Sequence, residues 1–253
     1  MKNYKISHEA PISILDEIQK KTDYDYCLLH MLLQDSEYRD WFIHKARKEH
    51  LILDNSAYEL GSGLTGDKIV EGFNLIKPEY VVAPDVIKDA TTTNKNFLDF
   101  KEKYGDQVGK IGGVVQASNF EEFEKSLQFM FEHADLVMVP VGIFKKGIIR
   151  FSTIQLCVDR GSWSFDKPVH LLGCKDLTEL YAYRYNPIEN IVSIDTSSPV
   201  QYVLENDEGY PIDITQYKKP TKMVDYKEVV SEKQLNKIYD NIRFFKTMLQ
   251  PSW

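Results

Sequence analysis

The stretch LILDNSAYELGSGLTGDKIVEGFNLIKPEYVVAPD, residues 51–85, decides the predicted fold. It begins with a short apolar run, LILDN (51–55), and ends with a second one, YVVAPD (80–85). Between them, TGDKIVEGFNLIK (65–77) begins with a threonine, a residue suited to cap a helix. The stretch therefore predicts a strand, a helix and a second strand, and each strand runs out at an aspartate.

The same alternation extends in both directions along the chain. Apolar runs of strand length recur as CLLHMLL (27–33), GGVVQ (112–116), LVMVPV (136–141), VHLLGC (169–174) and IVSIDT (191–196). Helical patterns lie at SEYRDWFIHKARKEH (36–50), which opens with a serine cap, NFEEFEKSLQFMFEH (119–133) and SEKQLNKIYDNIRFFKTML (231–249). Runs rich in Val, Ile and Leu without alternation are typical of parallel strands that helices cover on both faces.

An α/β barrel and an open doubly wound sheet both fit this alternation. The length of 253 residues and the regular repeat favour a (β/α)8 TIM barrel, a single domain over residues 1–253. Seven strands are clear. The eighth unit is irregular or incomplete, with its strand at PIDI (211–214) or near the N-terminus.

Composition narrows the class of protein. Lys+Arg 31 against Asp+Glu 38 gives a net charge of −7, which argues against a polybasic protein. Cys27, Cys157 and Cys174 are far apart and form no metal-binding spacing, so we expect a reduced, cytoplasmic protein. No window approaches the roughly 20 apolar residues of a membrane helix, and we expect no membrane contact.

The predicted strand ends carry a ring of acids, amides and glycines. They are Asp54, Asp85, Gln116, Gly142, Gly173 and Asp195. In a parallel barrel these ends open on one face, where active sites are built. An aspartate after a strand can also simply cap the next helix. Three such aspartates, with Gln116 between them in the sequence, favour a shared site in which the carboxylates meet at one end of the barrel.

The order of these motifs resembles the tRNA-guanine transglycosylases, which exchange a guanine in nucleic acid for a 7-deazaguanine base on a (β/α)8 barrel. The segments that carry the resemblance are DNSAYE (54–59), VVAPD (81–85), GGVVQ (112–116), VPVG (139–142), VHLLGC (169–174) and SIDTSSPV (193–200). They are similar, in order, to the family's Asp-Ser-Gly-Gly-Phe-Gln, its second aspartate strand, Gly-Ile-Val-Gln, Ala-Val-Gly, Tyr-Leu-Met-Gly and Phe-Asp-Cys-Val-Leu-Pro. The match covers about residues 51–200.

The resemblance implies a role for each matching residue. Asp195 would attack the sugar C1′ and form a covalent glycosyl intermediate, and Asp54 would move the proton on the departing and entering bases. The base would be held by the side chains or backbone of Asp85, Gln116, Val141 and Gly142, with Tyr58 stacked on its ring. No cofactor and no metal are implied.

The departures from the family bear on the polymer. Its tRNA-acting members carry a zinc site of clustered cysteines and a histidine near the C-terminus, whereas this chain has no cysteine after Cys174. We therefore expect no zinc subdomain and favour DNA over tRNA. Compact phage-encoded relatives, which insert 7-deazaguanines into DNA, resemble the pattern better, and the host cytoplasm would then be the location.

Basic residues offer candidate contacts to the polymer. Lys145, Lys146 and Arg150 follow the Gly142 loop and would bind backbone phosphates, and Lys218, Lys219 and Lys222 form a second group. A solvated charged face is the common alternative for both groups. His30 and His170 are interpreted as core or rim histidines.

Two other functions stay open. Asp54, Asp85 and Asp195 could bind Mg²⁺, since carboxylates suit hard cations. A barrel without catalysis could also serve as a binding module.

Overall fold

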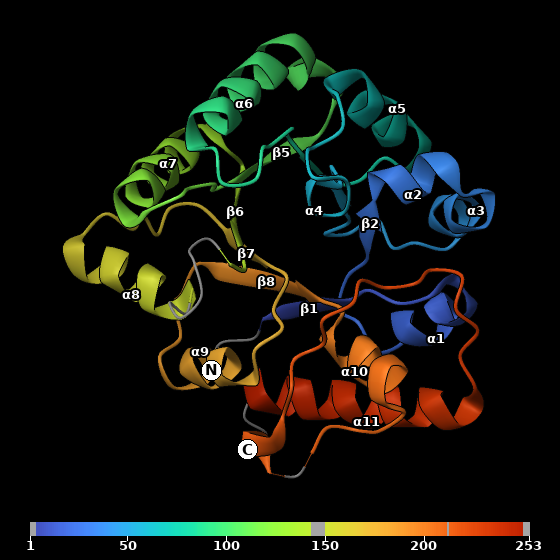
Figure 1. Cartoon of the computed structure of the whole chain (residues 1–253). Helices are drawn as coiled ribbons and strands as arrows, with labels where there is room; N and C mark the ends of the chain where they lie inside the picture. The colour runs from blue at the N-terminus through green and yellow to red at the C-terminus, as the bar shows by residue number, and fades with distance from the viewer. Residues whose placement is uncertain (1–3, 143–149, 212, 250–253) are drawn as a thin grey trace. The chain divides into compact units, whose positions relative to one another are not determined.

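The computed structural model describes residues 4–142, 150–211 and 213–249 and confirms the (β/α)8 fold. Its eight parallel strands form one sheet in the order β1-β8-β7-β6-β5-β4-β3-β2, the strand order of such a barrel with β1 and β2 at its ends (Figure 1). The strands are β1 (Lys5–His8), β2 (Tyr26–Leu28), β3 (Ile52–Asp54), β4 (Tyr80–Val82), β5 (Lys110–Val114), β6 (Leu136–Pro140), β7 (Val169–Leu172) and β8 (Ile191–Thr196).

Helices follow the strands along the chain. They are α1 (Leu15–Gln19), α2 (Leu29–Gln34), α3 (Ser36–His44), α4 (Ala57–Leu60), α5 (Gly66–Ile76), α6 (Ala90–Tyr104), α7 (Phe120–His133), α8 (Arg150–Arg160), α9 (Leu177–Tyr185), α10 (Ser198–Asn206) and α11 (Glu232–Leu249). Three short 3-10 turns, η1 (Ile12–Ile14), η2 (Gly105–Gln107) and η3 (Ile214–Gln216), add to them in the described part of the chain. Within that part, every helix is too short or too polar to span a bilayer.

The structure corrects two of the predicted elements and decides between the two alternatives left open for a third. The run 27–33 is a strand only up to Leu28, and the rest is helix α2, so that His30 lies in a helix. Helix α3 ends at His44 and is capped by Asp35, whose Oδ1 accepts the Tyr38 N–H at 2.9 Å, rather than by Ser36. The eighth strand is the N-terminal β1, and PIDI contributes no strand in its described residues.

The residue contacts divide the chain into two compact units. The first comprises Met1–Tyr24 and Leu171–Trp253, and the second comprises Asp25–His170. The boundaries fall just before β2 and inside β7.

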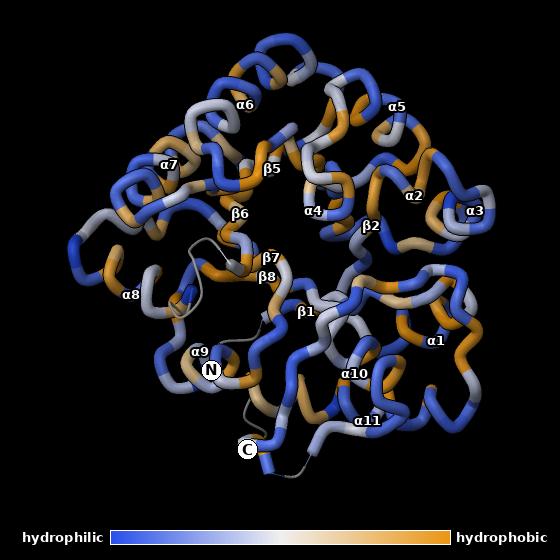
Figure 2. Tube along the Cα trace, in the orientation of Figure 1, coloured by the Kyte–Doolittle hydropathy of each residue, from blue (hydrophilic) through white to orange (hydrophobic). Residues whose placement is uncertain are grey.

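The second unit contains a run of paired parallel strands from β2 to β6. Leu28 pairs with Asp54, Leu53 with Val81, and Gly112 with both Val82 and Leu136. Helices α6 and α7 pack side by side on this sheet, and Figure 2 shows hydrophilic and hydrophobic stretches alternating along both of them. This amphipathic pattern buries one face of each helix against the strands.

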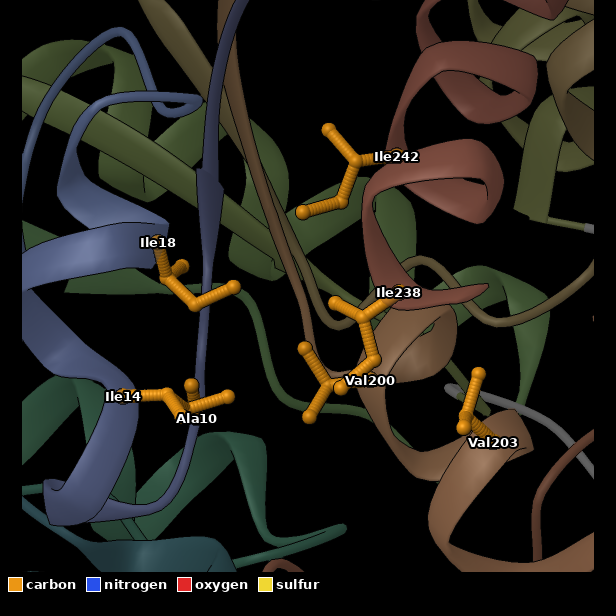
Figure 3. Close-up of a cluster of buried hydrophobic side chains, with 7 residues drawn as sticks. All are labelled: Ala10, Ile14, Ile18, Val200, Val203, Ile238 and Ile242. Atoms are coloured by element: carbon orange, nitrogen blue, oxygen red, sulfur yellow. The ribbon is translucent and has the colours of Figure 1, made fainter. Parts of the chain in front are cut away.

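The first unit is built on the β1–β8 pair. Ser7 lies opposite Asp195, and His8 lies opposite Thr196. Apolar side chains of α1, α10 and α11 and the segments beside them form a core cluster, shown in Figure 3, of Ala10, Ile14, Ile18, Val200, Val203, Ile238 and Ile242. The predicted helix at 231–249 is therefore confirmed, and its apolar face packs on this cluster.

His8 is a buried histidine at the end of β1. Its ring lies edge-on to Phe245, with the ring centroids 5.8 Å apart. Burial, together with the nearby Lys246 ammonium, lowers the pKa of His8 from 6.5 to about 3. The folded protein therefore keeps the imidazole neutral over a pH range in which the unfolded chain takes up a proton.

We expect this difference to make the first unit acid-sensitive. As the pH falls from 6.5 towards 3, proton uptake by the unfolded chain favours unfolding, by up to about 1.4 kcal/mol per pH unit. The free energy of unfolding in urea should therefore fall less steeply with pH in His8→Leu than in wild type. His44→Leu, at an exposed position, should keep the wild-type slope. Equal slopes for all three proteins would contradict the expectation.

Candidate functional site

The three strand-end aspartates do not cap the helices that follow them. The N-cap residues of α4, α6 and α10 are Ser56, Asp89 and Ser197. Asp54, Asp85 and Asp195 are all buried instead. A buried carboxylate is costly unless donors satisfy it, so the partners of each one indicate what it does.

Asp85 is the centre of a group of buried polar side chains in the second unit. Asn55 Nδ2 donates to Asp85 Oδ1 at 2.8 Å, and Gln116 Nε2 donates to Asp85 Oδ2 at 2.7 Å. Asn55 Nδ2 also donates to the Ala83 carbonyl oxygen at 2.6 Å. We call Asn55, Asp85 and Gln116 the amide–carboxylate cluster. It joins the carboxyl ends of β3, β4 and β5.

The orientation of both amides is fixed by their carbonyl oxygens. Asn55 Oδ1 accepts the Ala57 N–H at 2.9 Å, and Gln116 Oε1 accepts the Lys88 N–H at 2.9 Å. The NH₂ groups must therefore face Asp85. The backbone N–H of Asp85 itself also acts on the carboxylate. A carboxylate has about four acceptor positions, so these donors leave Asp85 capacity for a further N–H.

The electrostatic setting of Asp85 balances burial against hydrogen bonding. Burial raises the pKa of Asp85, and the hydrogen bonds from Asn55 and Gln116 act in the opposite direction. A ligand that brings N–H donors would add to the second effect. The cluster thus favours a ligand with adjacent N–H groups.

Asp54 is held by donors on both of its oxygens. The Tyr26 hydroxyl donates to Oδ1 at 2.8 Å, and the Ser56 N–H donates to Oδ2 at 2.7 Å. Ser56 has a φ of 64°, which is uncommon outside glycine and is typical of functional turns. Its Oγ accepts the His30 N–H at 3.1 Å, which ties the turn to α2.

The loop that carries Tyr58 is anchored to Asp85 at both ends. Asn55 contacts the Asp85 side chain, and the Gly63 N–H donates to the Asp85 carbonyl oxygen at 3.1 Å. Tyr58 lies on α4 between these anchors and is 64% exposed. The predicted stacking residue is therefore exposed and lies on a loop fixed to the cluster.

The loop after β6 contributes a second exposed edge. Val141 is 38% exposed, and Gly142 has a φ of 77° with open space where a Cβ would lie. Lys145 and Lys146 lie outside the described residues. Arg150 is buried, and its Nη1 donates to the Val139 carbonyl oxygen at 2.8 Å, so that the expected phosphate contact of this residue finds no support.

The second basic group is exposed. Lys218, Lys219 and Lys222 all lie on the surface of the first unit. This exposure fits a solvated face and a phosphate contact equally, so the role of this group stays a prediction.

Asp195 lies in the first unit, near the end of β8. Its Oδ1 accepts the Gly173 N–H at 3.0 Å, from the turn after β7. Tyr24 is buried close by: burial, followed by the charges of Asp195 and Asp23, raises the pKa of the Tyr24 hydroxyl. Gly173 has a φ of 60°, which a glycine adopts without strain. The predicted meeting of Asp195 with Asp54 and Asp85 stays a prediction.

The donors around the aspartates favour hydrogen bonding over cation binding. N–H or O–H groups point at both oxygens of Asp54 and of Asp85. The positive ends of these N–H and O–H dipoles occupy directions from which a hard cation would approach the carboxylate oxygens. Among the residues that the structure describes, no group of three or more His, Cys, Asp or Glu side chains is arranged to hold a metal ion.

Asn55 and Tyr26 are candidate residues that the sequence did not indicate. Each contacts an aspartate about thirty positions away, at sequence separations of 30 and 28 residues. The local signal for Asn55 is a polar residue directly after a buried strand-end aspartate. For Tyr26 the signal is strand periodicity. Tyr26 lies two residues before Leu28, and Leu28 lies opposite Asp54, so the side chains of Tyr26 and Asp54 lie on the same face of the sheet.

Taken together, the second unit carries two buried, hydrogen-bonded carboxylates, Asp54 and Asp85, and an exposed aromatic ring, Tyr58, on the loop between them. Such a set can bind a planar, donor-bearing heterocycle by its edge and its face. Comparison with models of known protein families and with curated protein sequences finds no match.

Proposed function

We propose that this chain is a base-exchange glycosyltransferase that replaces guanine in nucleic acid, with DNA favoured, by a 7-deazaguanine base. The observation that carries the proposal is the amide–carboxylate cluster. Guanine presents an N–H and an NH₂ group on one edge, and donors of this kind suit the acceptor oxygens of Asp85. A 7-deazaguanine has the same edge, so one site would accept the departing and the entering base.

The reaction assigned to the site balances as a double displacement. An Asp195 carboxylate oxygen forms a bond to C1′ while the bond from C1′ to the guanine nitrogen breaks, and the departing base takes a proton from Asp54. The entering base then gives its ring N–H proton to Asp54, forms the new C1′–N bond and displaces Asp195. Two inversions give overall retention.

The decisive experiment uses labelled guanine. The purified protein is incubated with radiolabelled guanine and, separately, with duplex DNA, single-stranded DNA and tRNA, in the presence and absence of a chelator. Label retained in DNA supports the proposal, and label retained in tRNA would reassign the polymer. Activity that the chelator abolishes would favour the magnesium enzyme, and polymer binding without exchange would favour a binding module.

Gly63 offers a test of the loop geometry. A Cβ at this position would lie 3.0 Å from the Asp85 backbone nitrogen and 3.1 Å from Asn55 Cγ, so Gly63→Ala must displace one of them. We expect guanine to bind roughly tenfold more weakly, about 1.4 kcal/mol, in an equilibrium binding assay. Gly105→Ala is the matched control, because its Cβ would meet only Lys101 Cγ, at 3.8 Å. Unchanged affinity in Gly63→Ala would show that the loop does not form the site.

A further inference from the structure

The side chain of Tyr26 enters no step of the proposed reaction, yet it contacts one of the two acids. It lies on β2, is 8% exposed, and donates its hydroxyl to Asp54 Oδ1 at 2.8 Å. The bond is buried and links neighbouring strands, since Leu28 and Asp54 are paired in the β2–β3 register. A hydrogen bond to a carboxylate in such a setting is stronger than one between neutral groups.

The ring of Tyr26 is itself fixed in place. It stacks on the buried imidazole of His170 from β7, with ring centroids 5.9 Å apart and planes 16° from parallel. Both rings belong to the second unit. Stacking on His170 and strand pairing at its own backbone hold the ring from which the hydroxyl donates to Asp54.

Donors on both oxygens restrict Asp54 in two ways. The Tyr26 hydroxyl and the Ser56 N–H fix the rotation of the carboxyl group, so that it cannot turn about its Cβ–Cγ bond without breaking a hydrogen bond. Donors of this kind also favour the ionised form over the protonated one. An acid that must give and then receive a proton at one position needs both a fixed direction and a ready conversion between the two forms.

We propose that Tyr26 is a positioning residue for Asp54: its hydroxyl donates to the Asp54 carboxylate and fixes the direction in which that group gives and receives the proton. This inference rests on the proposed function for its catalytic consequence. The Tyr26–Asp54 interaction itself does not depend on that function.

Other ionisable groups face Asp54 and belong in the argument. Cys27 lies on β2. Burial raises the pKa of its thiol, and the nearby charge of Asp54 also raises it. His170 lies behind the Tyr26 ring, and Asp85 is connected to the Asp54 turn through Asn55. The Tyr26 hydroxyl donates to Asp54 Oδ1, and Tyr26→Phe removes this hydrogen bond while it keeps the ring.

A double-mutant cycle with exchange as the readout gives the first test. Tyr26→Phe should lower the rate of guanine exchange roughly tenfold or more in the wild-type background, and by less than about twofold when Asp54 is already Asn. Tyr38→Phe is the matched control: it removes a buried hydroxyl that accepts the Leu28 N–H at 3.1 Å on the same strand. Its effect should be small and equal in both backgrounds.

The second test does not use activity. Because the Tyr26 hydrogen bond is stronger to the ionised carboxylate, the loss of unfolding free energy in Tyr26→Phe should shrink as the pH falls below the ordinary aspartate pKa of about 3.9, whereas the loss in Tyr38→Phe should stay constant. A pH-independent loss in Tyr26→Phe, or an equal factor in both Asp54 backgrounds, would overturn the inference. Absence of exchange in wild type would instead refute the proposed function, and the stability measurement would still decide the Tyr26–Asp54 interaction.

Discussion

Asp85→Asn should lower guanine exchange by roughly a hundredfold while nucleic-acid binding changes little. The substitution replaces one acceptor oxygen with an NH₂ group that faces the NH₂ group of Asn55 or of Gln116, so that two donors meet. It also removes one of the acceptors that would receive the guanine edge. A buried donor left without a partner costs about 1–3 kcal/mol, and the variant leaves donors unpaired on both the protein and the base. Binding of labelled guanine and of DNA, measured separately, checks the prediction.

Asp135→Asn is the matched control for this variant. Asp135 lies at the amino end of β6 in the same unit, where its Oδ2 accepts the Ile111 N–H at 2.8 Å. It therefore carries a comparable hydrogen bond at the opposite edge of the sheet. We expect exchange to survive in Asp135→Asn. Equal loss of guanine binding and polymer binding in Asp85→Asn would indicate a folding defect instead of a role in base choice.

The fold was predictable because local sequence patterns identify most of its helices and strands. The runs at 51–55 and 80–85 contain β3 and β4, and the helix at 119–133 is confirmed with Asn119 as its cap, since Asn119 Oδ1 accepts the Glu122 N–H. The prediction of a strand over residues 27–33 was wrong for a physical reason. A short apolar run bounded by polar residues is equally typical of a buried strand and of a buried helix, and periodicity does not separate them.

The site was only partly predictable, because its key contacts join residues that are distant in the chain. Asp54, Asp85 and Gln116 stand out as polar residues at the ends of apolar runs. The partner of each one depends on strand register: Asn55 meets Asp85 only because β3 and β4 are neighbours. Arg150 shows the opposite error. Lys145 and Lys146, a few positions before it, suggest a surface, yet Arg150 is buried and donates to the Val139 carbonyl oxygen.

The proposed roles of the amide–carboxylate cluster and of Asp195 rest on different kinds of support. The geometry of Asn55, Asp85 and Gln116 supports recognition of an N–H edge without reference to any other protein. The role of Asp195 comes from the resemblance, to which the structure adds its burial and the Gly173 hydrogen bond. A test of Asp195 therefore has to detect the covalent species itself, because loss of activity alone would not separate a nucleophile from a structural acid.

Asp195→Asn should abolish both exchange and the covalent adduct, whereas Asp54→Asn should slow exchange by about 10²–10⁴-fold and still form some adduct. An amide cannot act as the attacking carboxylate, but proton transfer to the base can proceed slowly from water. Denaturing the protein during turnover with labelled DNA should therefore trap a protein–DNA species in wild type and not in Asp195→Asn. Asp23→Asn is the control in the same unit, since Asp23 Oδ2 also accepts a backbone N–H, from Ile6 at 2.9 Å, and it should form the adduct normally. If the adduct persisted undiminished in Asp195→Asn, the nucleophile would have to be Asp54 or Asp85. The donors on both oxygens of Asp54 would then be read as stabilising an attacking carboxylate instead of a proton-transfer acid.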